Sequence, residues 1–333
     1  MQFGILGSGS WATALAKILT DNNTPIHWWI RNQSTIAYID TRHHNPHYLS
    51  SAYFNTKLLY LNNYIREVID KSDVIVIAVP SAYITEALSG LPKNIFKGKK
   101  IVSAIKGILP SCNQLLNDYL VENFDFDIKD YFTVLGPCHA EEVASEKLSH
   151  LTFSGVDEET SKVIAAHFHT QYLNTVINMD VPGVQYAAVL KNIYALGAGI
   201  AHGLEYGDNF QSVYIANSAD EMVVFLRKVV SEHAQIDQIN YAASVYLGDL
   251  LVTCYSLFSR NRTFGNMLGK GYSVKAAQLE LNMVAEGYNA SKCIFTINQK
   301  VGAEMPIAET IYKILWQNLP PVEGFRNIEE ILK

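Results

Sequence analysis

The sequence contains no long apolar run and no excess of basic residues. Its apolar stretches fall well short of the roughly 18 residues that a membrane-spanning helix needs, so we predict no membrane span. Asp and Glu number 32 against 26 Lys and Arg, which gives a formal net charge of −6. Such a chain has no general basic field to hold a nucleic-acid backbone. We therefore expect no nucleic-acid partner, and we interpret Trp28 and Trp29 as core or surface aromatics instead of a base-stacking platform.

Cysteine is also scarce, and the few cysteines stand far apart. The sequence has no C-x-x-C pair and no dense cysteine framework like that of small secreted domains. The four cysteines are Cys112, Cys138, Cys254 and Cys293. At the N-terminus, the apolar segment Phe3–Leu6 runs directly into glycine, without the basic segment and the roughly 7–15-residue apolar stretch of a secretory signal. We expect a cytoplasmic protein.

Two groups of reactive side chains do not support a site. Pro46 would break any helix that aligned His43 with His47, and no cysteine or acidic ligand lies beside them. We therefore predict no metal site. Cys138 and His139 are adjacent in the chain, where side chains rarely point at one another, so we do not expect a nucleophile with its base.

The pattern of apolar runs predicts two domains. A chain of 333 residues favours two domains at about 150 residues each. In the first half, short apolar runs alternate with helix-like stretches, as in β-α units that wind a parallel sheet. After about Pro182 the strand-like runs disappear, and residues 184–202 and 211–230 are suited to long helices. We predict an α/β fold, with a Rossmann-type doubly wound sheet over residues 1–180 and a mainly α-helical domain over 181–333.

Individual elements of the first half follow from the same pattern. The run from Asp73 to Pro80 is almost entirely apolar, as a strand buried on both faces should be, and proline ends it. A helix is predicted from Trp11 to about Leu19. The other expected strands are Phe3–Leu6, Ile26–Ile30, Lys100–Ser103, Phe132–Leu135, Leu151–Ser154 and Leu173–Ile177.

A glycine-rich turn follows the first predicted strand. The sequence Gly7-Ser8-Gly9-Ser10-Trp11-Ala12 has the pattern G-x-G-x-x-A, directly between a strand and a helix. The first glycine permits a tight turn, the second lets a pyrophosphate approach the backbone, and the small Ala12 allows the helix to pack closely on the strand. The N-terminus of the helix would face the anion with unpaired N–H groups and a positive dipole end. The turn therefore predicts dinucleotide binding.

The end of the second predicted strand bears on the choice of cofactor. An NAD site usually has an acidic residue about 20 positions beyond the turn, where it accepts hydrogen bonds from the ribose 2′-OH. Here the strand ends in Ile30-Arg31-Asn32, without a carboxylate to repel a 2′-phosphate and with an arginine that could pair with one. This favours NADPH, unless Arg31 is simply a solvated side chain at a strand end.

Several separate sequence motifs follow one another along the chain. Those of the first half are Gly7-x-Gly9-x-Trp11-x-Thr13-Ala14-Leu15-Ala16, Ala78-Val79-Pro80-Ser81, Lys106-Gly107 and Gly136-Pro137-x-x-Ala140-Glu141-Glu142-Val143. Those of the second half are Leu190-Lys191-Asn192, Gly203-Leu204-x-x-Gly207-x-Asn209, Gly248-Asp249-Leu250, Ser259-Arg260-Asn261-Arg262 and Glu286-Gly287. On these motifs the chain resembles the bacterial NAD(P)-dependent glycerol-3-phosphate dehydrogenases over nearly its whole length. The resemblance implies reversible reduction of dihydroxyacetone phosphate to sn-glycerol 3-phosphate, which supplies glycerophospholipid synthesis.

Carried over position by position, the resemblance also implies site residues. Those expected to contact the nicotinamide cofactor are Gly7, Gly9, Ser10, Trp11, Arg31, Lys106, Ala140, Arg260, Val284 and Glu286. Those expected to contact the substrate are Lys106, Gly136, Lys191, Asp249, Ser259, Arg260 and Asn261. The chain departs from the family at Cys138, where Ser or Thr is usual, and a thiol donates hydrogen bonds only weakly.

Ketone reduction needs a proton donor, because hydride addition leaves charge on the oxygen. Lys191 suits this task, since it lies in the helical stretch 187–193, which is otherwise almost free of charge and where desolvation lowers a lysine pKa. Asp249 and Thr253 stand four residues apart and share a face if their segment is helical, and that face could orient Lys191. We therefore expect Lys191 and Asp249 to be catalytic. The alternative for Asp249 is a carboxylate that only stabilises a helix N-terminus.

The substrate phosphate needs a cluster of donors. Arg260, Asn261 and Arg262 crowd donors together and could clamp a dianion, unless they form a solvated basic turn. Lys106 follows a predicted strand, which would put its ammonium at the edge where open α/β sheets bind ligands, unless it is an ordinary loop lysine. The expected partner is thus a small phosphorylated substrate, and a homodimer is compatible with the resemblance.

Two other functions stay open from the sequence. One is a related two-domain dehydrogenase that acts on a hydroxy acid such as 6-phosphogluconate or ketopantoate. The other is a protein that binds a nicotinamide dinucleotide without catalysis. The phosphate clamp argues against the first, and the joint presence of Lys191 and Asp249 argues against the second.

Overall fold

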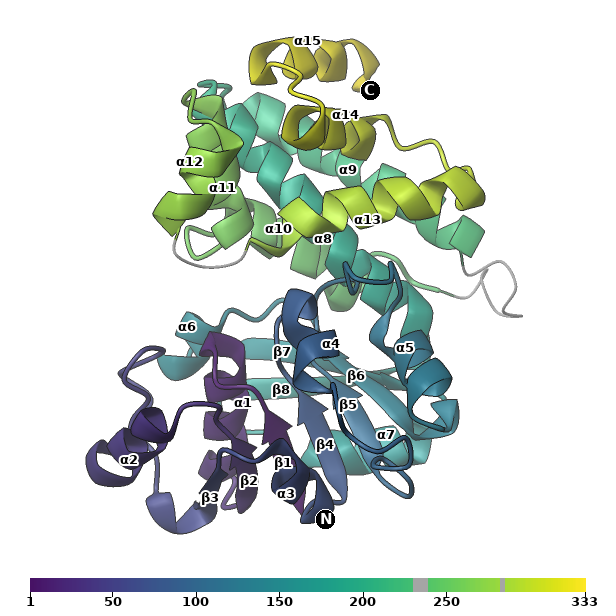
Figure 1. Cartoon of the computed structure of the whole chain (residues 1–333). Coiled ribbons are helices and arrows are strands. Elements are labelled where there is room, and N and C mark those ends of the chain that lie inside the picture. Colours follow the sequence, from purple (N-terminus) through teal and green to yellow (C-terminus); the bar gives the residue numbers. More distant parts are fainter. Residues whose placement is uncertain (230–238, 282–284) are drawn as a thin grey trace. The chain divides into compact units, whose positions relative to one another are not determined.

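The chain forms two compact units, one with a sheet and one built of helices (Figure 1). The structure, a computed structural model, describes residues 1–229, 239–281 and 285–333. The first unit comprises Met1–Ile105 and Gln114–Val181, and the second comprises Lys106–Asn113 and Pro182–Lys333. The predicted fold class, a doubly wound sheet followed by helices, is confirmed. The short segment Lys106–Asn113 belongs with the helical unit although it follows a strand of the first.

One sheet forms the centre of the first unit. Its strands are β1 (Phe3–Leu6), β2 (Ile26–Trp29), β3 (Leu59–Asn62), β4 (Val74–Ile77), β5 (Lys100–Ser103), β6 (Tyr131–Leu135), β7 (Ser149–Gly155) and β8 (Leu173–Asn178). Within the described residues the sheet has eight strands in the order β3-β2-β1-β4-β5-β6-β7-β8. The first six follow the order 3-2-1-4-5-6 of dinucleotide-binding folds. All residues of β1 and β4 are buried, which explains why both strands are apolar throughout.

The structure differs from the predicted sheet in two respects. The edge strand β3 was not predicted, although residues 58–61 form an apolar run of four; in the sheet Leu59 is buried and Tyr60 is exposed. In addition, β7 runs antiparallel to β6. The connection between them contains only the five-residue helix α6 (Ala140–Ala144), which is shorter than the usual crossover between parallel strands.

Helices flank this sheet, as Figure 1 shows. Besides α6 they are α1 (Ser10–Asp21), α2 (Gln33–Arg42), α3 (Ile65–Asp70), α4 (Ile84–Ala87), α5 (Leu116–Asn123) and α7 (Glu158–Ala166). Helix α3 packs against β1 and β2, α7 packs against β7 and β8, and α1 lies beside α6. Apolar residues of β1, β2, β4 and α1 share one core with Phe153 and Phe168, so the turn between β1 and α1 rests on a rigid base.

The second unit is built of helices around α8 (Val181–Gly203). The others are α9 (Asp208–Val229), α10 (Asp249–Tyr255), α11 (Arg260–Gly269), α12 (Val274–Leu281), α13 (Glu286–Val301), α14 (Pro306–Trp316) and α15 (Pro321–Ile331). Every residue of α8 from 191 to 200 is buried. A helix that is apolar on all sides is buried on all sides, so the lysine in this stretch is enclosed by protein.

Glycines allow α8 and α11 to cross with their backbones in contact. Gly199 and Gly203 stand one turn apart on α8, and Gly265 and Gly269 do the same on α11. A Cβ atom at Gly265 would lie 1.9 Å from the carbonyl oxygen of Leu196, and one at Gly199 would lie 2.0 Å from a carbonyl oxygen of α11. Real Cβ atoms do not approach this closely. The glycines therefore set how near the first turn of α11 comes to the buried part of α8.

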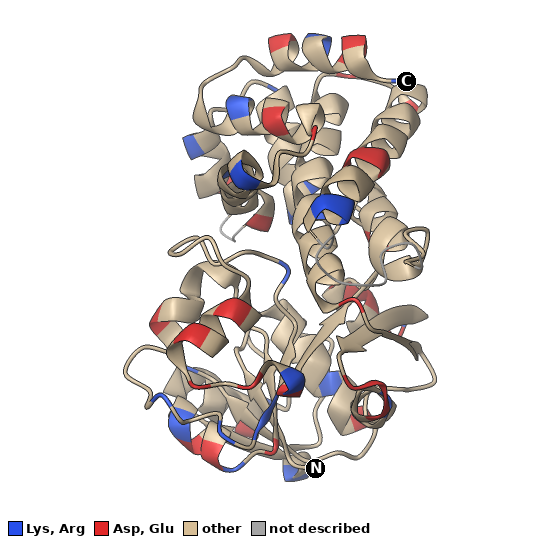
Figure 2. Cartoon of the chain, turned by 90° about the vertical axis from the view of Figure 1, so that its right-hand side faces the viewer, with Lys and Arg blue, Asp and Glu red and all other residues tan. Residues whose placement is uncertain are grey.

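The helices and the charged residues can be compared with the expectations from composition. No helix in the described ranges is long and apolar enough to cross a membrane. In Figure 2 acidic and basic residues are interspersed over both units instead of being gathered in one of them.

Candidate active site

The glycine-rich turn lies at the carboxyl ends of β1 and β4, where the strand order reverses. Open α/β sheets bind ligands at this point. Gly7 has a φ of +122°, in the region that favours glycine. A Cβ atom there would lie 2.8 Å from the carbonyl oxygen of Ala78. Only glycine therefore allows the turn to close this tightly against the end of β4.

Gly9 leaves the N-terminus of α1 open. Its φ of −75° is accessible to any residue, and no atom lies within 4 Å of the place a Cβ would take. No side chain caps the helix, and its first turn has no acidic residue. The positive dipole end of α1 thus has room beside Gly9 for an anion. These features fit the pyrophosphate of a dinucleotide.

The two glycines give a matched test of this arrangement. We expect Gly9→Ala to leave thermal stability unchanged and to raise the Kd for NADPH at least about 10-fold, because the new methyl group would occupy the space of the pyrophosphate. Gly7→Ala should instead lower the free energy of unfolding by about 2 kcal/mol, because of its positive φ and the overlap with Ala78. Calorimetric titration and thermal unfolding separate the two effects. Unchanged NADPH affinity in Gly9→Ala would place the pyrophosphate elsewhere.

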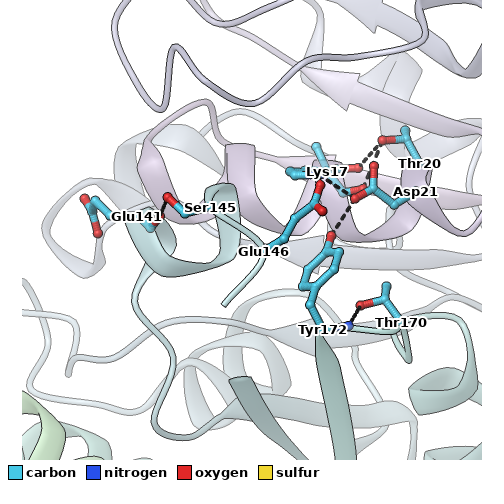
Figure 3. Close-up of polar contacts among 9 residues, drawn as sticks. Lys17, Thr20, Asp21, Glu141, Ser145, Glu146, Thr170 and Tyr172 are labelled. Atoms are coloured by element: carbon cyan, nitrogen blue, oxygen red, sulfur yellow. Dashed lines mark hydrogen bonds and ion pairs between the residues drawn. The ribbon is translucent and has the colours of Figure 1, made fainter. Parts of the chain in front are cut away.

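The other end of α1 is anchored by a polar cluster (Figure 3). The Lys17 ammonium lies 2.6 Å from Asp21 Oδ2 and 3.0 Å from Glu146 Oε1. The Tyr172 hydroxyl donates to the same Asp21 oxygen at 2.6 Å. Burial alone would lower the pKa of Lys17, but the hydrogen bonds and charges of Asp21 and Glu146 raise it above its ordinary value. The cluster ties α1 to the segments that precede β7 and β8, and so it helps to hold the helix in place.

The structure puts four other predicted residues of the first unit at the starts of helices or the end of a strand. Ser10 and Ala140 are the buried first residues of α1 and α6, and Trp11 is half-buried in the first turn of α1. Gly136 follows β6 with a φ of +127°, and a Cβ there would lie 3.1 Å from the His150 carbonyl oxygen. The unusual Cys138 is buried.

Arg31 is exposed in the bend between β2 and α2. The next residue, Asn32, caps α2 by accepting hydrogen bonds from the N–H of Ser34 at 3.0 Å and from its hydroxyl at 2.8 Å. Asn32, and not Arg31, caps the helix. The first turn of α2 has no carboxylate that would repel a 2′-phosphate beside Arg31.

In the second unit, Lys191 of α8 and Asp249 of α10 form an ion pair between Nζ and Oδ1. The side chains are only 3% and 2% exposed, so both charges are withdrawn from water. The second carboxylate oxygen of Asp249, Oδ2, is buried and has no hydrogen-bond partner among the described residues. A buried oxygen without a partner is costly. Its presence beside an ammonium is typical of a site that a polar ligand completes.

Thr253 donates its hydroxyl proton within its own helix. It does lie on the same helix face as Asp249, but its hydroxyl donates to the backbone carbonyl of Asp249 at 2.6 Å. Hydroxyls on helices readily bond the carbonyl four residues earlier, so the Thr253 proton is used within α10.

A second positive charge lies near the ion pair. Burial raises the pKa of the Cys254 thiol, while the charges of Lys191 and Arg262 act on it in the opposite direction. The Nε atom of Arg262 is buried and has no hydrogen-bond partner within the described ranges. Arg262 was expected in a phosphate clamp, and the structure brings its charge close to the same thiol as Lys191.

A chain of amide hydrogen bonds joins the elements around Lys191. Asn192 donates from Nδ2 to the carbonyl of Lys106 at 2.8 Å, and Asn261 donates from Nδ2 to Oδ1 of Asn192 at 2.9 Å. The N–H of Gly287 then donates to Oδ1 of Asn261 at 2.9 Å. The segment after β5, the first turn of α11 and the first turn of α13 are thereby fixed to the middle of α8.

The remaining predicted residues lie along this framework. Ser259 caps α11, and its hydroxyl oxygen accepts the N–H of Arg262 at 3.3 Å. Arg260 and Glu286 are the first residues of α11 and α13, and both are partly exposed, as is Lys106. Val284, a predicted cofactor contact, lies outside the described residues.

Sequence reasoning missed the part that Asn192 plays and a buried carboxylate at Glu221. Asn192 follows Lys191 in a buried helix, and its uncharged amide in an apolar stretch was the only signal. Glu221 accepts the N–H groups of Ile307 at 2.7 Å and Ala308 at 2.9 Å, and burial raises its pKa to about 7. It caps the N-terminus of α14, so its role is structural.

Known proteins resemble this chain over both units. The sequence matches the NAD-dependent glycerol-3-phosphate dehydrogenase N-terminus over residues 2–161 and the C-terminus of the same enzymes over residues 180–326. It is 32% identical over 329 residues to the glycerol-3-phosphate dehydrogenase [NAD(P)+] of Macrococcus caseolyticus, which covers 98% of this chain and 97% of the relative. The corresponding protein of Chlorobium phaeobacteroides is 30% identical over 329 residues, with the same coverage.

Solved structures agree with these matches. The crystal structure of glycerol-3-phosphate dehydrogenase from Coxiella burnetii superposes with a TM-score of 0.88 at 26% identity and covers 99% of this chain and 98% of that one. A 2-dehydropantoate 2-reductase from Geobacter metallireducens reaches only 0.56 at 13% identity and shares the fold alone. From the matches over both units, the chain belongs to the NAD-dependent glycerol-3-phosphate dehydrogenase family.

Proposed function

We propose that this chain reduces dihydroxyacetone phosphate to sn-glycerol 3-phosphate with NADPH or NADH, reversibly, and so supplies glycerophospholipid synthesis. The observation that carries the proposal is the buried Lys191–Asp249 ion pair in a chain of this family. A binding protein without catalysis would have no need for two charges withdrawn from water, because such a pair seldom adds net stability.

The chemistry assigns a role to each member of the pair. The bound nicotinamide supplies a hydride to the ketone carbon. As the new C–H bond forms, the electron pair of the C=O π bond moves onto the oxygen, which takes a proton from the Lys191 ammonium. Asp249 holds that ammonium in place. In the reverse direction Lys191 accepts the hydroxyl proton while hydride leaves the carbon.

The phosphate of the substrate requires cationic and N–H donors. We assign it to Arg260 with Ser259, Asn261, Lys106 and Gly136, on the strength of their places in the family motifs. In Asn261 the carbonyl oxygen and one amide proton are already used within the unit, which leaves a second amide proton for a ligand.

The residues proposed to hold the cofactor are those of the glycine-rich turn and those that the family motifs imply. They are Gly7, Gly9, Ser10, Trp11, Arg31, Lys106, Ala140, Arg260, Val284 and Glu286. We further propose that residues 1–180 serve dinucleotide binding and residues 181–333 serve substrate binding and catalysis, in a cytoplasmic enzyme that forms a homodimer.

One assay tests the proposed reaction. Oxidation of NADPH and NADH is followed at 340 nm with dihydroxyacetone phosphate and, as controls, with unphosphorylated dihydroxyacetone and ketopantoate. We expect turnover with the phosphorylated ketone alone. Turnover with ketopantoate would indicate a hydroxy-acid dehydrogenase, and cofactor binding without turnover on any substrate would indicate a binding protein.

Arg31 is proposed to favour NADPH. Removing its guanidinium in Arg31→Ala should raise KM for NADPH about 10-fold and leave KM for NADH nearly unchanged, because only NADPH carries the 2′-phosphate. The exposed Arg42 at the other end of α2 supplies a control in Arg42→Ala, which should alter neither value. Equal effects of Arg31→Ala on the two cofactors would remove the assignment.

A further inference from the structure

Three carbonyl groups in a row, those of the glycine-rich turn, each accept a hydrogen bond from a side chain. The pairs are Trp28 Nε1 to the Gly7 oxygen at 2.6 Å, Asn45 Nδ2 to the Ser8 oxygen at 3.1 Å, and Thr13 Oγ1 to the Gly9 oxygen at 2.9 Å. Two of the donors come from outside the turn and α1, because Trp28 belongs to β2 and Asn45 lies beyond α2.

These hydrogen bonds control the direction of the N–H groups. The structure has no cis peptide bonds among its described residues. In a planar trans peptide the C=O of one residue and the N–H of the next point in opposite directions. The three side chains that hold these carbonyls therefore also fix the N–H groups of Ser8, Gly9 and Ser10, each of which points away from the side chain that holds the preceding carbonyl. In the part of the chain that the structure describes, none of these three N–H groups donates a hydrogen bond to protein.

Asn45 makes a complete set of bonds around the turn. Its Nδ2 donates one proton to the Ser8 oxygen and the other to Thr13 Oγ1 at 2.9 Å, and its Oδ1 accepts the N–H of His47 at 3.0 Å. The opposite orientation of the amide would set an oxygen against a carbonyl oxygen. Asn45 thus links the turn to the first part of α1 in a single arrangement.

Burial of the donor side chains strengthens the control of these bonds over the peptide orientation. Trp28, Asn45 and Thr13 are each 0% exposed. The bond to the Gly7 oxygen is buried, whereas the bonds to the Ser8 and Gly9 oxygens are partly buried. Without the Trp28 donor the buried Gly7 carbonyl is left unsatisfied, and its peptide can regain a partner by rotating. Rotation would turn the following N–H group away from its present direction.

We infer that Trp28 and Asn45 are positioning residues for the cofactor, which hold the peptides of the turn so that successive N–H groups point at the dinucleotide phosphates. The inference rests on the proposed function for the identity of the anion. It assigns Trp28 a role that its place among buried aromatics does not suggest. Trp28 and Asn45 themselves need not touch the cofactor.

The neighbouring residue provides a matched control for Trp28. Trp29 also donates from its indole nitrogen to a backbone carbonyl, that of Asn63 at 3.1 Å, away from the turn. Trp28→Phe should raise the Kd for NADPH about 10-fold in calorimetric titration, while kcat at saturating NADPH stays within 2-fold of wild type. Trp29→Phe should change neither.

A second matched pair tests Asn45. Asn22 likewise donates both amide protons to backbone carbonyls, those of His167 at 2.9 Å and His169 at 2.7 Å. Asn45→Asp removes the donors and should weaken NADPH binding at least about 10-fold, whereas Asn22→Asp should leave the Kd within 2-fold. Thermal unfolding of all four variants reports any loss of fold.

The outcomes separate this inference from the proposed function. If Trp28→Phe and Asn45→Asp bind NADPH with wild-type affinity, the inference is overturned and the proposed function stands. The same holds if the control variants Trp29→Phe and Asn22→Asp lose as much NADPH affinity. A wild-type protein that neither binds NADPH nor reduces dihydroxyacetone phosphate overturns the proposed function itself. If Asn45→Asp fails to fold, Trp28→Phe, which keeps an aromatic ring in the core, decides the question.

Discussion

Lys191→Met should lower kcat and kcat/KM for dihydroxyacetone phosphate together, by about 10²–10⁴-fold, while NADPH still binds. Methionine keeps roughly the length of the side chain and removes its proton and charge. An interaction that acts mainly in the transition state affects both kinetic constants equally. Steady-state kinetics beside calorimetric titration of NADPH measure the two effects separately.

The burial of the ion pair adds a consequence for stability. Without Lys191, Asp249 is left as a buried charge without its partner, and breaking such a pair costs about 3–5 kcal/mol. Asp249→Asn leaves the ammonium alone in the same way. The double variant Lys191→Met/Asp249→Asn contains neither charge, so it should unfold at a higher temperature than either single variant and yet be no more active than Lys191→Met.

A surface ion pair supplies the control for this experiment. Lys313 pairs with Glu309 at 2.8 Å, with side chains 43% and 49% exposed. Lys313→Met should therefore change the free energy of unfolding by less than about 1 kcal/mol and leave kcat unchanged. Near-normal turnover in Lys191→Met would assign the proton donor to another group, and loss of NADPH binding would make Lys191 a structural residue.

Gly265→Ala should lower the free energy of unfolding by about 3 kcal/mol or more, although alanine is the better helix former. The added methyl group would lie 1.9 Å from the carbonyl oxygen of Leu196 and 2.9 Å from the backbone nitrogen of Ile200. These are backbone atoms of α8, so they cannot rotate away as a side chain would. The overlap can be relieved only by moving α11 away from α8.

The expected displacement should also reduce activity. Arg260 and Asn261 lie in the first turn of α11, and Asn261 is bonded to Asn192 of α8. Moving α11 would disturb both, so we expect KM for dihydroxyacetone phosphate to rise. Gly207→Ala is the control, because that position is exposed with no atom within 4 Å of its Cβ site. A Gly265→Ala variant as stable as wild type in chemical denaturation would contradict the close crossing of the helices.

Local sequence was sufficient for the dinucleotide turn and for most of the sheet. The apolar runs predicted β1 at its observed ends and β4 within three residues of its observed ends, because a strand buried on both faces must be apolar throughout. Gly7 and Gly9 were predicted because each answers a local requirement of the turn. The edge strand β3 was missed although residues 58–61 are apolar, because an apolar run does not by itself tell a strand from a helix or a loop.

The predicted catalytic pair depended on more than local pattern. Lys191 and Asp249 are separated by 58 positions in the chain, so no spacing rule joins them. The uncharged surroundings of Lys191 singled it out as a proton donor, and the family resemblance implied both residues. Their ion pair exists because α8 and α10 pack together. Thr253 shows the limit of helical spacing, since it lies on the expected face and yet bonds a backbone carbonyl.

The hydrogen bonds of Trp28, Asn45 and Asn192 could not be predicted from the sequence, because they join segments that are far apart in the chain. Trp28 and Asn45 are separated from the carbonyls they hold by 21 and 37 positions, and only the folded sheet brings them to the turn. The same is true of Asn192, whose amide joins segments 86 and 69 positions away. Strand and helix patterns arise from periodic burial of neighbouring residues, so one sequence shows them directly. Hydrogen bonds between groups far apart in the chain produce no periodic pattern in the sequence, because a buried polar side chain meets its partner only in the folded protein.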